Sequence, residues 1–374
     1  NIEEEIEESK KTMELLNGTN NLSTENFQET IKDQREVLEK YKNLIKYYED
    51  KNGSEFYKLQ KDLYTKNITY QSYIDYFNNT FKDGTLSEIS KIISEKRIEE
   101  FENRNIKPFY NVGVFVSAYD EFNNYNYFRS YLNDETPNNH QALYSIYRAN
   151  NLYNIQSVLL VFILIFFLGS WTYDKEKGDK LSFLFTKPVN KSKYHIEIIK
   201  NQIINITTYI LLMFLLSMVI YSIFSGVGEL NLPIVKYNGL SPDKNSSVIN
   251  QSKYYSFMNL STYILKYVFA LILVAIFIGS VTNILSLYVD KTINLYICTF
   301  IFLGLGILLV NMIDMDIIQL ILPFGYLNPS KVRTGEIIVK YGNSNMTYLM
   351  GIVSLIGWSI INNIFSFIIL DDKL

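Results

Sequence analysis

From Ile203 to Phe224 the chain reads IINITTYILLMFLLSMVIYSIF. This stretch carries no charged side chain, and its length matches the roughly 20 apolar residues that a helix needs to cross a hydrocarbon core about 30 Å thick. Unbroken apolar runs of this length are typical of transmembrane helices rather than of globular cores. The stretch therefore predicts a membrane-spanning helix, and with it an all-α membrane protein.

Four more runs of this kind lie in the same part of the chain. The five predicted spans cover about residues 155–173, 203–224, 261–289, 293–312 and 347–370. Their centres are almost free of charge, as expected because a charged side chain at the centre of a span costs about 2.5–3.5 kcal/mol. Lys266 lies near one end of the third span, where its long stem reaches the headgroups, so we interpret it as an anchor rather than a substrate contact. Residues 153–374 are thus predicted to form a transmembrane domain.

Residues 1–152 have a different character and are predicted to form a separate, mainly α-helical domain. Residues 1–150 carry 26 acidic and 19 basic side chains, a net charge of −7, whereas the rest of the chain has a net charge of +4. Apolar residues recur there with the 3.6-residue period of amphipathic helices. The three stripes comprise Phe27, Ile31, Val37, Leu38, Tyr41, Leu44, Ile45 and Tyr48; then Phe56, Leu59 and Leu63; then Leu86, Ile89, Ile92, Ile93, Ile98 and Phe101.

Such stripes most often pack against one another in a helical bundle or hairpin, and dedicated substrate capture is the alternative interpretation. Ser23 or Thr24 is suited to begin the first helix, and Asn52-Gly53 to end it. The stretch Phe109–Ala118 is apolar but too short and too glycine-broken to span a membrane. It is either a buried strand or a segment that lies on the outer leaflet.

Composition excludes several classes of function. The single cysteine, Cys298, cannot form an intrachain disulfide, and the two histidines, His140 and His195, leave no Cys/His cluster for structural zinc. The sequence contains no phosphate-binding G-x-x-x-x-G-K-[ST] loop, and no basic stripe that would indicate nucleic acid. The membrane half shows no catalytic triad, metal cluster or carboxylate pair, so we expect neither catalytic residues nor a metal or other cofactor in this chain.

Lysine placement predicts the orientation. The loop at residues 174–202 carries seven lysines, namely Lys175, Lys177, Lys180, Lys187, Lys191, Lys193 and Lys200. Because cytoplasmic loops are enriched in lysine and arginine, this loop is placed in the cytoplasm. Alternation then places residues 225–259 and 313–346 outside, the turn at 290–291 inside, the C-terminus in the cytoplasm and residues 1–152 outside. An extracellular N-terminal segment requires either a cleaved signal peptide or a further helix before Asn1.

The same loop, Asp174 to Lys200, is the most informative part of the sequence for function. Leu181, Leu184 and Phe185 fall at i, i+3 and i+4, which predicts a short amphipathic helix over about residues 179–186. Lys187-Pro188 should end it, because the residue before a proline disfavours the helical conformation. Such a helix is well placed to dock a soluble partner, but an ordinary lysine-rich loop that fixes topology explains the residues equally well.

The loop resembles the cytoplasmic loop of ABC-2-type transporter permeases, the membrane subunits of bacterial ABC exporters. The resemblance rests on Asp174-x-Glu176-x-Gly178, Leu181, Leu184, Lys187-Pro188-Val189 and Lys200. In that family an acidic-basic-acidic-x-Gly-Thr run precedes a leucine-rich short helix and a Pro-Val-x-Arg/Lys turn. The chain departs from the pattern at Asp179, where threonine is usual. The motif covers about 27 residues, and the pattern of spans extends the resemblance over residues 155–374.

The resemblance implies a six-span transmembrane domain whose first span is missing from this chain, with residues 1–152 inserted extracellularly between the first and second spans. It also implies dimers of permease copies or homologues, and a coupling helix that docks in a separate ATP-binding-cassette ATPase carrying ATP and Mg. The implied ATPase-coupling residues, which transmit force rather than catalyse, are Asp174, Glu176, Gly178, Leu181, Leu184, Lys187, Pro188 and Val189. An uncleaved helix before Asn1 would fit this family.

Four features near the end of the chain add expectations. The run Ile317–Phe324 is apolar but too short to cross, and resembles the re-entrant element that relatives place before their last span. Asp314 and Asp316 are expected to be solvated rather than to bind an ion. Gly304 and Gly306 permit close helix packing, and Asn362-Asn363 is placed to hydrogen-bond across a helix interface.

Two functions from different classes follow. The first is the permease subunit of an ATP-driven exporter in a bacterial plasma membrane, which moves an amphipathic, peptide or lipid-like substrate out of the cell; the substrate-binding residues are unknown. The second is a non-transporting membrane sensor or scaffold whose helical ectodomain binds a ligand. The expected partners of the first are the ATPase, a second permease copy and the lipid bilayer, and no nucleic acid.

Overall fold

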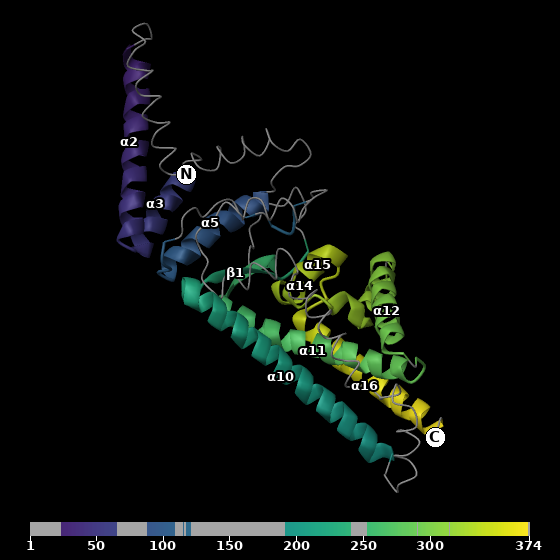
Figure 1. The fold of residues 1–374 in the computed structure, drawn as a ribbon. Helices are drawn as coiled ribbons and strands as arrows, with labels where there is room; N and C mark the ends of the chain where they lie inside the picture. Colours follow the sequence, from purple (N-terminus) through teal and green to yellow (C-terminus); the bar gives the residue numbers. More distant parts are fainter. Residues whose placement is uncertain are drawn as a thin grey trace. The chain divides into compact units, whose positions relative to one another are not determined.

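The computed structural model describes residues 24–65, 88–108, 115, 117–120, 191–240, 253–289, 291–313 and 315–372 (Figure 1). It is mostly helical, as predicted. The chain divides into two compact units: residues 1–139 with 231–233, and residues 140–230 with 234–374.

The first unit contains α2 (Thr24–Glu49), α3 (Gly53–Thr65) and α5 (Glu88–Asn103). The described residues begin at Thr24, so the start at Ser23 or Thr24 stays a prediction; α2 ends three residues before the predicted stop. A Cβ on Gly53 would lie 1.9 Å from the carbonyl oxygen of Ile106, so the joint between α2 and α3 requires glycine.

The core of this unit forms where α3 packs against α5. Tyr57 and Phe101 are both fully buried, and their rings stack with centroids 5.1 Å apart. The predicted apolar stripes supply most of this core, because Phe56, Leu63, Ile89, Ile93 and Ile98 are also buried.

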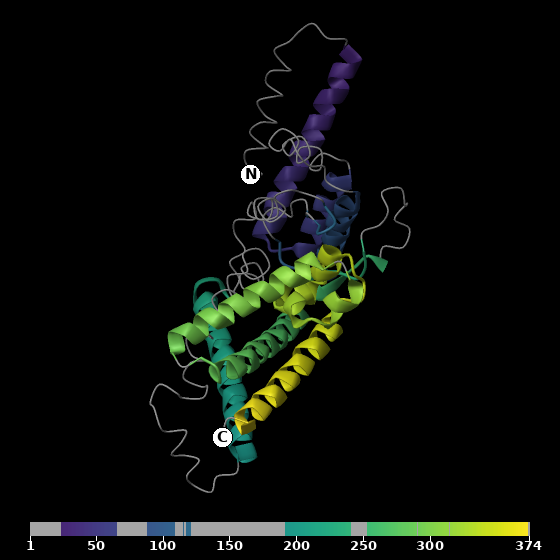
Figure 2. The same ribbon diagram turned by 90° about the vertical axis from the view of Figure 1, so that its right-hand side faces the viewer.

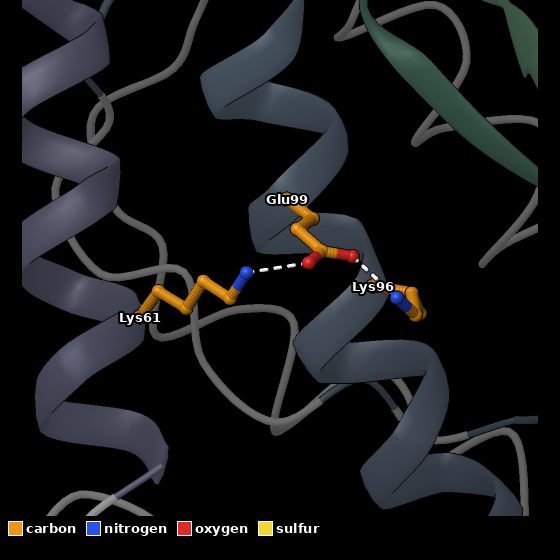
Figure 3. Close-up of polar contacts among 3 residues, drawn as sticks. All are labelled: Lys61, Lys96 and Glu99. Atoms are coloured by element: carbon orange, nitrogen blue, oxygen red, sulfur yellow. Dashed lines mark hydrogen bonds and ion pairs between the residues drawn. The ribbon is translucent and has the colours of Figure 1, made fainter.

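An ion-paired glutamate joins α3 to α5 at the edge of this core (Figure 3). The Glu99 carboxylate accepts hydrogen bonds from Lys61 on α3 and from Lys96 one turn earlier on α5, the latter at 2.6 Å. These bonds hold the pKa of Glu99 below its ordinary value and, by the same Lys61–Glu99 bond, raise the pKa of Lys61. Each charge in this group is therefore met by an opposite one.

Buried hydroxyl groups of α5 hold the segment around residue 117. The Ser94 hydroxyl accepts from the Phe115 amide at 2.8 Å, and Ser90 donates to Asp120 at 2.5 Å. Phe115 is buried. Segment 109–118 was predicted to be either a buried strand or a segment on the outer leaflet. Only residues 115, 117 and 118 of it are described, and none of them is in a strand.

The second unit is built on four long apolar helices, α10 (Lys191–Ser225), α11 (Leu260–Ser286), α12 (Thr292–Met312) and α16 (Tyr348–Asp372). Each is long and apolar enough to cross a membrane. They confirm the helices predicted at 203–224, 261–289, 293–312 and 347–370, whereas the predicted span 155–173 lies outside the described residues.

Helix α11 is the centre of this unit. It packs along α16 and α10 and also touches α12, and it runs beside α16 in both views (Figures 1 and 2). About two thirds of the most apolar 18-residue stretch of α11 is buried, whereas only 11% of the corresponding stretch of α10 is buried. Leu215, Val219 and Ile223 of α10 are more than half exposed, which suits a helix whose outer face meets lipid.

Short elements join these helices. Strands β1 (Pro233–Tyr237) and β2 (Tyr255–Asn259) form a two-stranded sheet that the sequence analysis did not predict. Between α12 and α16 the chain forms α13 (Asp316–Ile321), a 3₁₀ turn η2 (Pro323–Tyr326), α14 (Pro329–Thr334) and α15 (Glu336–Tyr341).

The apolar run Ile317–Phe324 forms α13 and the start of η2, which agrees with the prediction that it is too short to span. Ser354 and Trp358 of α16 donate hydrogen bonds to the carbonyl oxygen of Ile321, at 2.7 and 3.0 Å. The end of α13 is thus fixed to α16, and a re-entrant position in the membrane stays a prediction. Asp316 is exposed, and Asp314 lies outside the described residues.

The two glycines of α12 have different surroundings. A Cβ on Gly306 would lie 2.3 Å from the ring of Phe324, so the predicted close packing is confirmed there. At Gly304 a Cβ would meet no described atom within 4 Å. Gly304 is exposed among the described helices, so close packing there stays a prediction.

Candidate functional site

Six polar side chains, five of them buried and one, that of Asn363, half-buried, meet where α10, α11 and α16 pack together. We call this group the polar clasp. Its members are His195 and Gln202 of α10, Ser280 and Asn283 of α11, and Asn362 and Asn363 of α16. His195 and Gln202 lie seven residues apart and therefore on the same face of their helix. Polar groups in apolar helices are costly unless they find partners, so their convergence is informative.

The centre of the clasp is a pair of amides. Asn283, which is completely buried, donates to the Gln202 carbonyl oxygen at 2.8 Å, and Gln202 donates back at 3.4 Å. Gln202 also donates to the main-chain oxygen of Gly279 at 3.4 Å. These bonds join α10 to α11.

Helix α16 enters the clasp through its adjacent asparagines. Asn362 donates to the Ser280 hydroxyl at 3.1 Å, and Asn283 lies 3.5 Å from the side-chain oxygen of Asn363. The Nε2 of His195 donates a hydrogen bond to the main-chain oxygen of Asn363 at 3.0 Å. The expected hydrogen bonding of Asn362-Asn363 across a helix interface is therefore confirmed.

Glycine at position 279 makes the clasp possible. A Cβ there would lie 2.9 Å from the Gln202 amide nitrogen and 3.4 Å from Ile206. A larger residue would displace the Gln202 side chain, and the displaced amide would lose its bond to Asn283. Gly279 thus sets how closely α10 approaches α11.

The clasp favours one discrete packing of the three helices. Each bond between transmembrane helices contributes only about 0.6 kcal/mol on average, whereas an amide left buried without a partner costs about 1–3 kcal/mol. A small displacement of one helix would leave several amides unpaired at once. The helices therefore either move together or exchange one complete set of partners for another.

A largely apolar pocket of about 560 Å³ lies beside the clasp. Its wall includes His195 and Asn363, together with isoleucines of α10 such as Ile199 and Ile203 and with Phe367 of α16. Apart from a few polar groups it offers only dispersion contacts. The pocket is suited to an apolar chain and carries no chemistry of its own.

The predicted ATPase-coupling residues lie outside the described residues. They are Asp174, Glu176, Gly178, Leu181, Leu184, Lys187, Pro188 and Val189. Helix α10 begins at Lys191, two residues after the last of them, and His195 lies in its second turn. Gln202, Ser280 and Asn283 are not among the residues predicted from the sequence, although a polar residue within an apolar run is a signal that the sequence does contain.

The described part of the chain contains no group of three or more His, Cys, Asp or Glu residues that could hold a metal ion.

Comparisons with known proteins return no match, whether to a family model, to a curated protein or to a solved structure. The resemblance to ABC-2-type permeases therefore depends on the residues of the 174–200 loop and on the order of the apolar runs.

Proposed function

We propose that the chain is the permease subunit of an ATP-driven exporter of the ABC-2 type, which moves an amphipathic, peptide or lipid-like substrate out of the cell. The observation that carries this proposal is the continuity of α10, which runs without a break from Lys191 to Ser225. It begins two residues after Val189, the last of the implied ATPase-coupling residues, and holds two members of the polar clasp in its first four turns.

This continuity supports a mechanical role for the loop. An unbroken α-helix behaves as a stiff rod, because every turn is held by main-chain hydrogen bonds. A displacement of the loop at residues 174–190 would reach His195 and Gln202, and through their hydrogen bonds α16 and α11. Packed interfaces of this kind switch between discrete arrangements rather than deform continuously.

The energy source in this proposal is a separate chain. ATP and Mg would bind an ATP-binding-cassette ATPase that docks against the loop, and a second permease copy would complete the transport path. The orientation follows from the lysines of the loop: residues 174–202 and the C-terminus face the cytoplasm of a bacterium, and residues 1–152 lie outside. The chain itself is expected to catalyse no reaction.

The test is ATP turnover coupled to a docked ATPase. The full chain is purified with the ATPase encoded beside it, and Glu176→Ala and Gly178→Pro are expected to abolish the stimulation of ATP hydrolysis by the permease. Glu197→Ala is the matched control, because Glu197 is an exposed acid at the start of α10 that is not one of the eight implied ATPase-coupling residues. Its ion pair with Lys200 spans 3.5 Å.

Two results would contradict the proposal. One is an ATPase that binds equally well after residues 174–190 are removed. The other is a monomeric protein without an ATPase whose activity is abolished by removal of residues 1–150, since that result would favour the sensor or scaffold.

A further inference from the structure

Arg333 on α14 is a buried cation for which the described part of the chain supplies no counter-charge. Its side chain is only 5% exposed, and its Nε meets no hydrogen-bond acceptor among the described residues. No carboxylate in the described part of the chain lies within ion-pair distance of its guanidinium. An isolated charge buried in this way is strongly unfavourable, so the site calls for an anion from elsewhere.

The second cation of this site is Lys266, which contacts the same aromatic ring as Arg333. The guanidinium carbon of Arg333 and the Nζ of Lys266 lie 5.7 and 5.8 Å from the centre of one ring, that of Tyr348. Both distances suit cation–π contacts, which soften the charges but do not neutralise them. Arg333 and Lys266 therefore share one aromatic side chain.

The third cation, Lys236, is brought in by the β-sheet. Strand β1 lies against the joint between α14 and α15, where a Cβ on Gly335 would lie 2.2 Å from the Tyr237 oxygen. Gly335 also has a φ of +79°. Glycine is therefore favoured there both by the close contact and by the left-handed backbone conformation. This contact places Lys236, the neighbour of Tyr237, close to Arg333.

The three positive charges repel one another. Burial lowers the pKa of Lys236, and the charges of Arg333 and Lys266 lower it further. Burial also lowers the pKa of Arg333, against an opposing contribution from Tyr348 and Tyr263. Glu336, three residues beyond Arg333, is buried but forms no ion pair with it; its carboxylate accepts a hydrogen bond from Thr334 at 3.3 Å.

The cluster lies where two candidate membrane spans begin. Tyr348 is the first residue of α16, and Lys266 lies in the second turn of α11. The Tyr348 hydroxyl donates to the main-chain oxygen of Lys266 at 2.9 Å, so the two helices start side by side. Tyrosine and lysine at the ends of spans mark the level of the lipid headgroups.

We propose that Arg333, Lys236 and Lys266 together bind the phosphate of an anionic lipid headgroup. The planar fork of an arginine matches two phosphate oxygens, and each lysine adds a point charge. Leu265 and Phe269, one turn apart on α11, are 73% and 47% exposed. They offer an apolar track beside Lys266 for an acyl chain, which favours a lipid over a free phosphate ion.

The test measures lipid binding to the full chain in detergent by native mass spectrometry. Phosphatidylglycerol, phosphatidylcholine and inorganic phosphate are titrated separately, and phosphatidylglycerol is expected to bind most tightly. Arg333→Met should weaken that binding by roughly 10- to 100-fold, as loss of hydrogen bonds to a charged group implies. Lys236→Gln and Lys266→Gln should each weaken it by about fivefold.

Lys340→Gln is the matched control. Lys340 is an exposed lysine of α15 whose Nζ lies 4.6 Å from the centre of the Tyr341 ring, whereas Arg333 and Lys266 contact the ring of Tyr348. Its loss should leave binding unchanged. Retained phosphatidylglycerol affinity in Arg333→Met would overturn the proposal, as would equal weakening in Lys340→Gln. A response to inorganic phosphate without one to phosphatidylglycerol would overturn the assignment to a lipid.

The variant also has to be shown to be folded. The melting temperature of Arg333→Met without lipid should be at least that of the unmodified chain, because the substitution removes an unpaired charge. Added phosphatidylglycerol should raise the melting temperature of the unmodified chain but not that of the variant. A lipid-dependent rise of equal size in both proteins would contradict the proposed site.

Discussion

The two ends of α11 hold polar groups in opposite conditions. At Asn283, near the end of the helix, neutral side chains pair with one another and satisfy most of their hydrogen-bonding capacity. At Lys266, near its start, cations gather around a buried arginine that has no described counter-charge. The two residues are 17 positions apart, which corresponds to about 25 Å of helix. A satisfied polar group fixes helix packing, whereas an unsatisfied one indicates a ligand.

The largest effect is expected at the centre of the clasp. Asn283→Leu leaves the Gln202 amide buried without its partner, which should lower the free energy of unfolding by about 2–3 kcal/mol. Thermal unfolding of the full chain in detergent measures it. Ser366→Ala is the control, because the Ser366 hydroxyl is buried on α16 without a hydrogen-bond partner among the described residues. Equal losses in the two variants would mean that the clasp does not stabilise the packing.

A smaller loss is expected from crowding the same contact. Gly279→Ala places a methyl group 2.9 Å from the Gln202 nitrogen, and overpacking of this kind costs about 1–2 kcal/mol. Gly304→Ala adds the same methyl group where no described atom lies within 4 Å. The same thermal measurement should show Gly304→Ala unchanged or slightly stabilised. A tolerated Gly279→Ala would show that α10 is free to retreat from α11.

The opposite sign is expected at the other end of α11. Without anionic lipid, Arg333→Met should leave the free energy of unfolding unchanged or raise it by about 1 kcal/mol, because an apolar side chain replaces an unpaired buried charge. Chemical unfolding in lipid-free detergent measures this. A marked loss of stability in that condition would show that Arg333 is satisfied within the chain, and the contrast between the two ends would disappear.

The smallest effect is expected where charges are paired, at Glu99. Its pKa is lower in the folded protein than in the unfolded chain, so its contribution is complete near neutral pH and is lost as the pH falls through the lowered pKa. Glu99→Gln should destabilise α3 and α5 by about 0.5 kcal/mol and should flatten their acid dependence. Hydrogen exchange of these helices in the full chain measures both, and an unchanged acid dependence would refute the assignment.

Sequence predicts the long helices well because their signal is local. The apolar stretch at 203–224 meets the length requirement by itself, and α10 contains it completely. The sheet was missed because its strands have only five residues each, too few for a clear period. Two of the six clasp residues, Asn362 and Asn363, were predicted to hydrogen-bond across a helix interface, because they stand out in an apolar run. Their partners could not be predicted, because these depend on which helices face each other.

The cation cluster was beyond prediction for a different reason. Lys236, Lys266 and Arg333 come from three separate segments, and no spacing in the sequence relates them. Only the packing of β1 on Gly335 and the shared ring of Tyr348 bring them together. Lys266 was interpreted as a lone anchor, which its exposure permits, and its neighbours became visible only in three dimensions.

The length of α10 has a consequence for the host membrane. Its 35 residues correspond to about 52 Å, of which the uncharged stretch 203–224, about 33 Å long, matches a hydrocarbon core of roughly 30 Å. The first turns, with Lys191, Lys193, Glu197 and Lys200, extend beyond that stretch. In a thinner bilayer this stretch becomes longer than the hydrocarbon core, and such a hydrophobic mismatch is relieved by tilting. Because the clasp ties the first turns of α10 to its neighbours, a change in tilt would strain those bonds. Bilayer thickness, set by acyl-chain length, thereby becomes a control on how the helices pack.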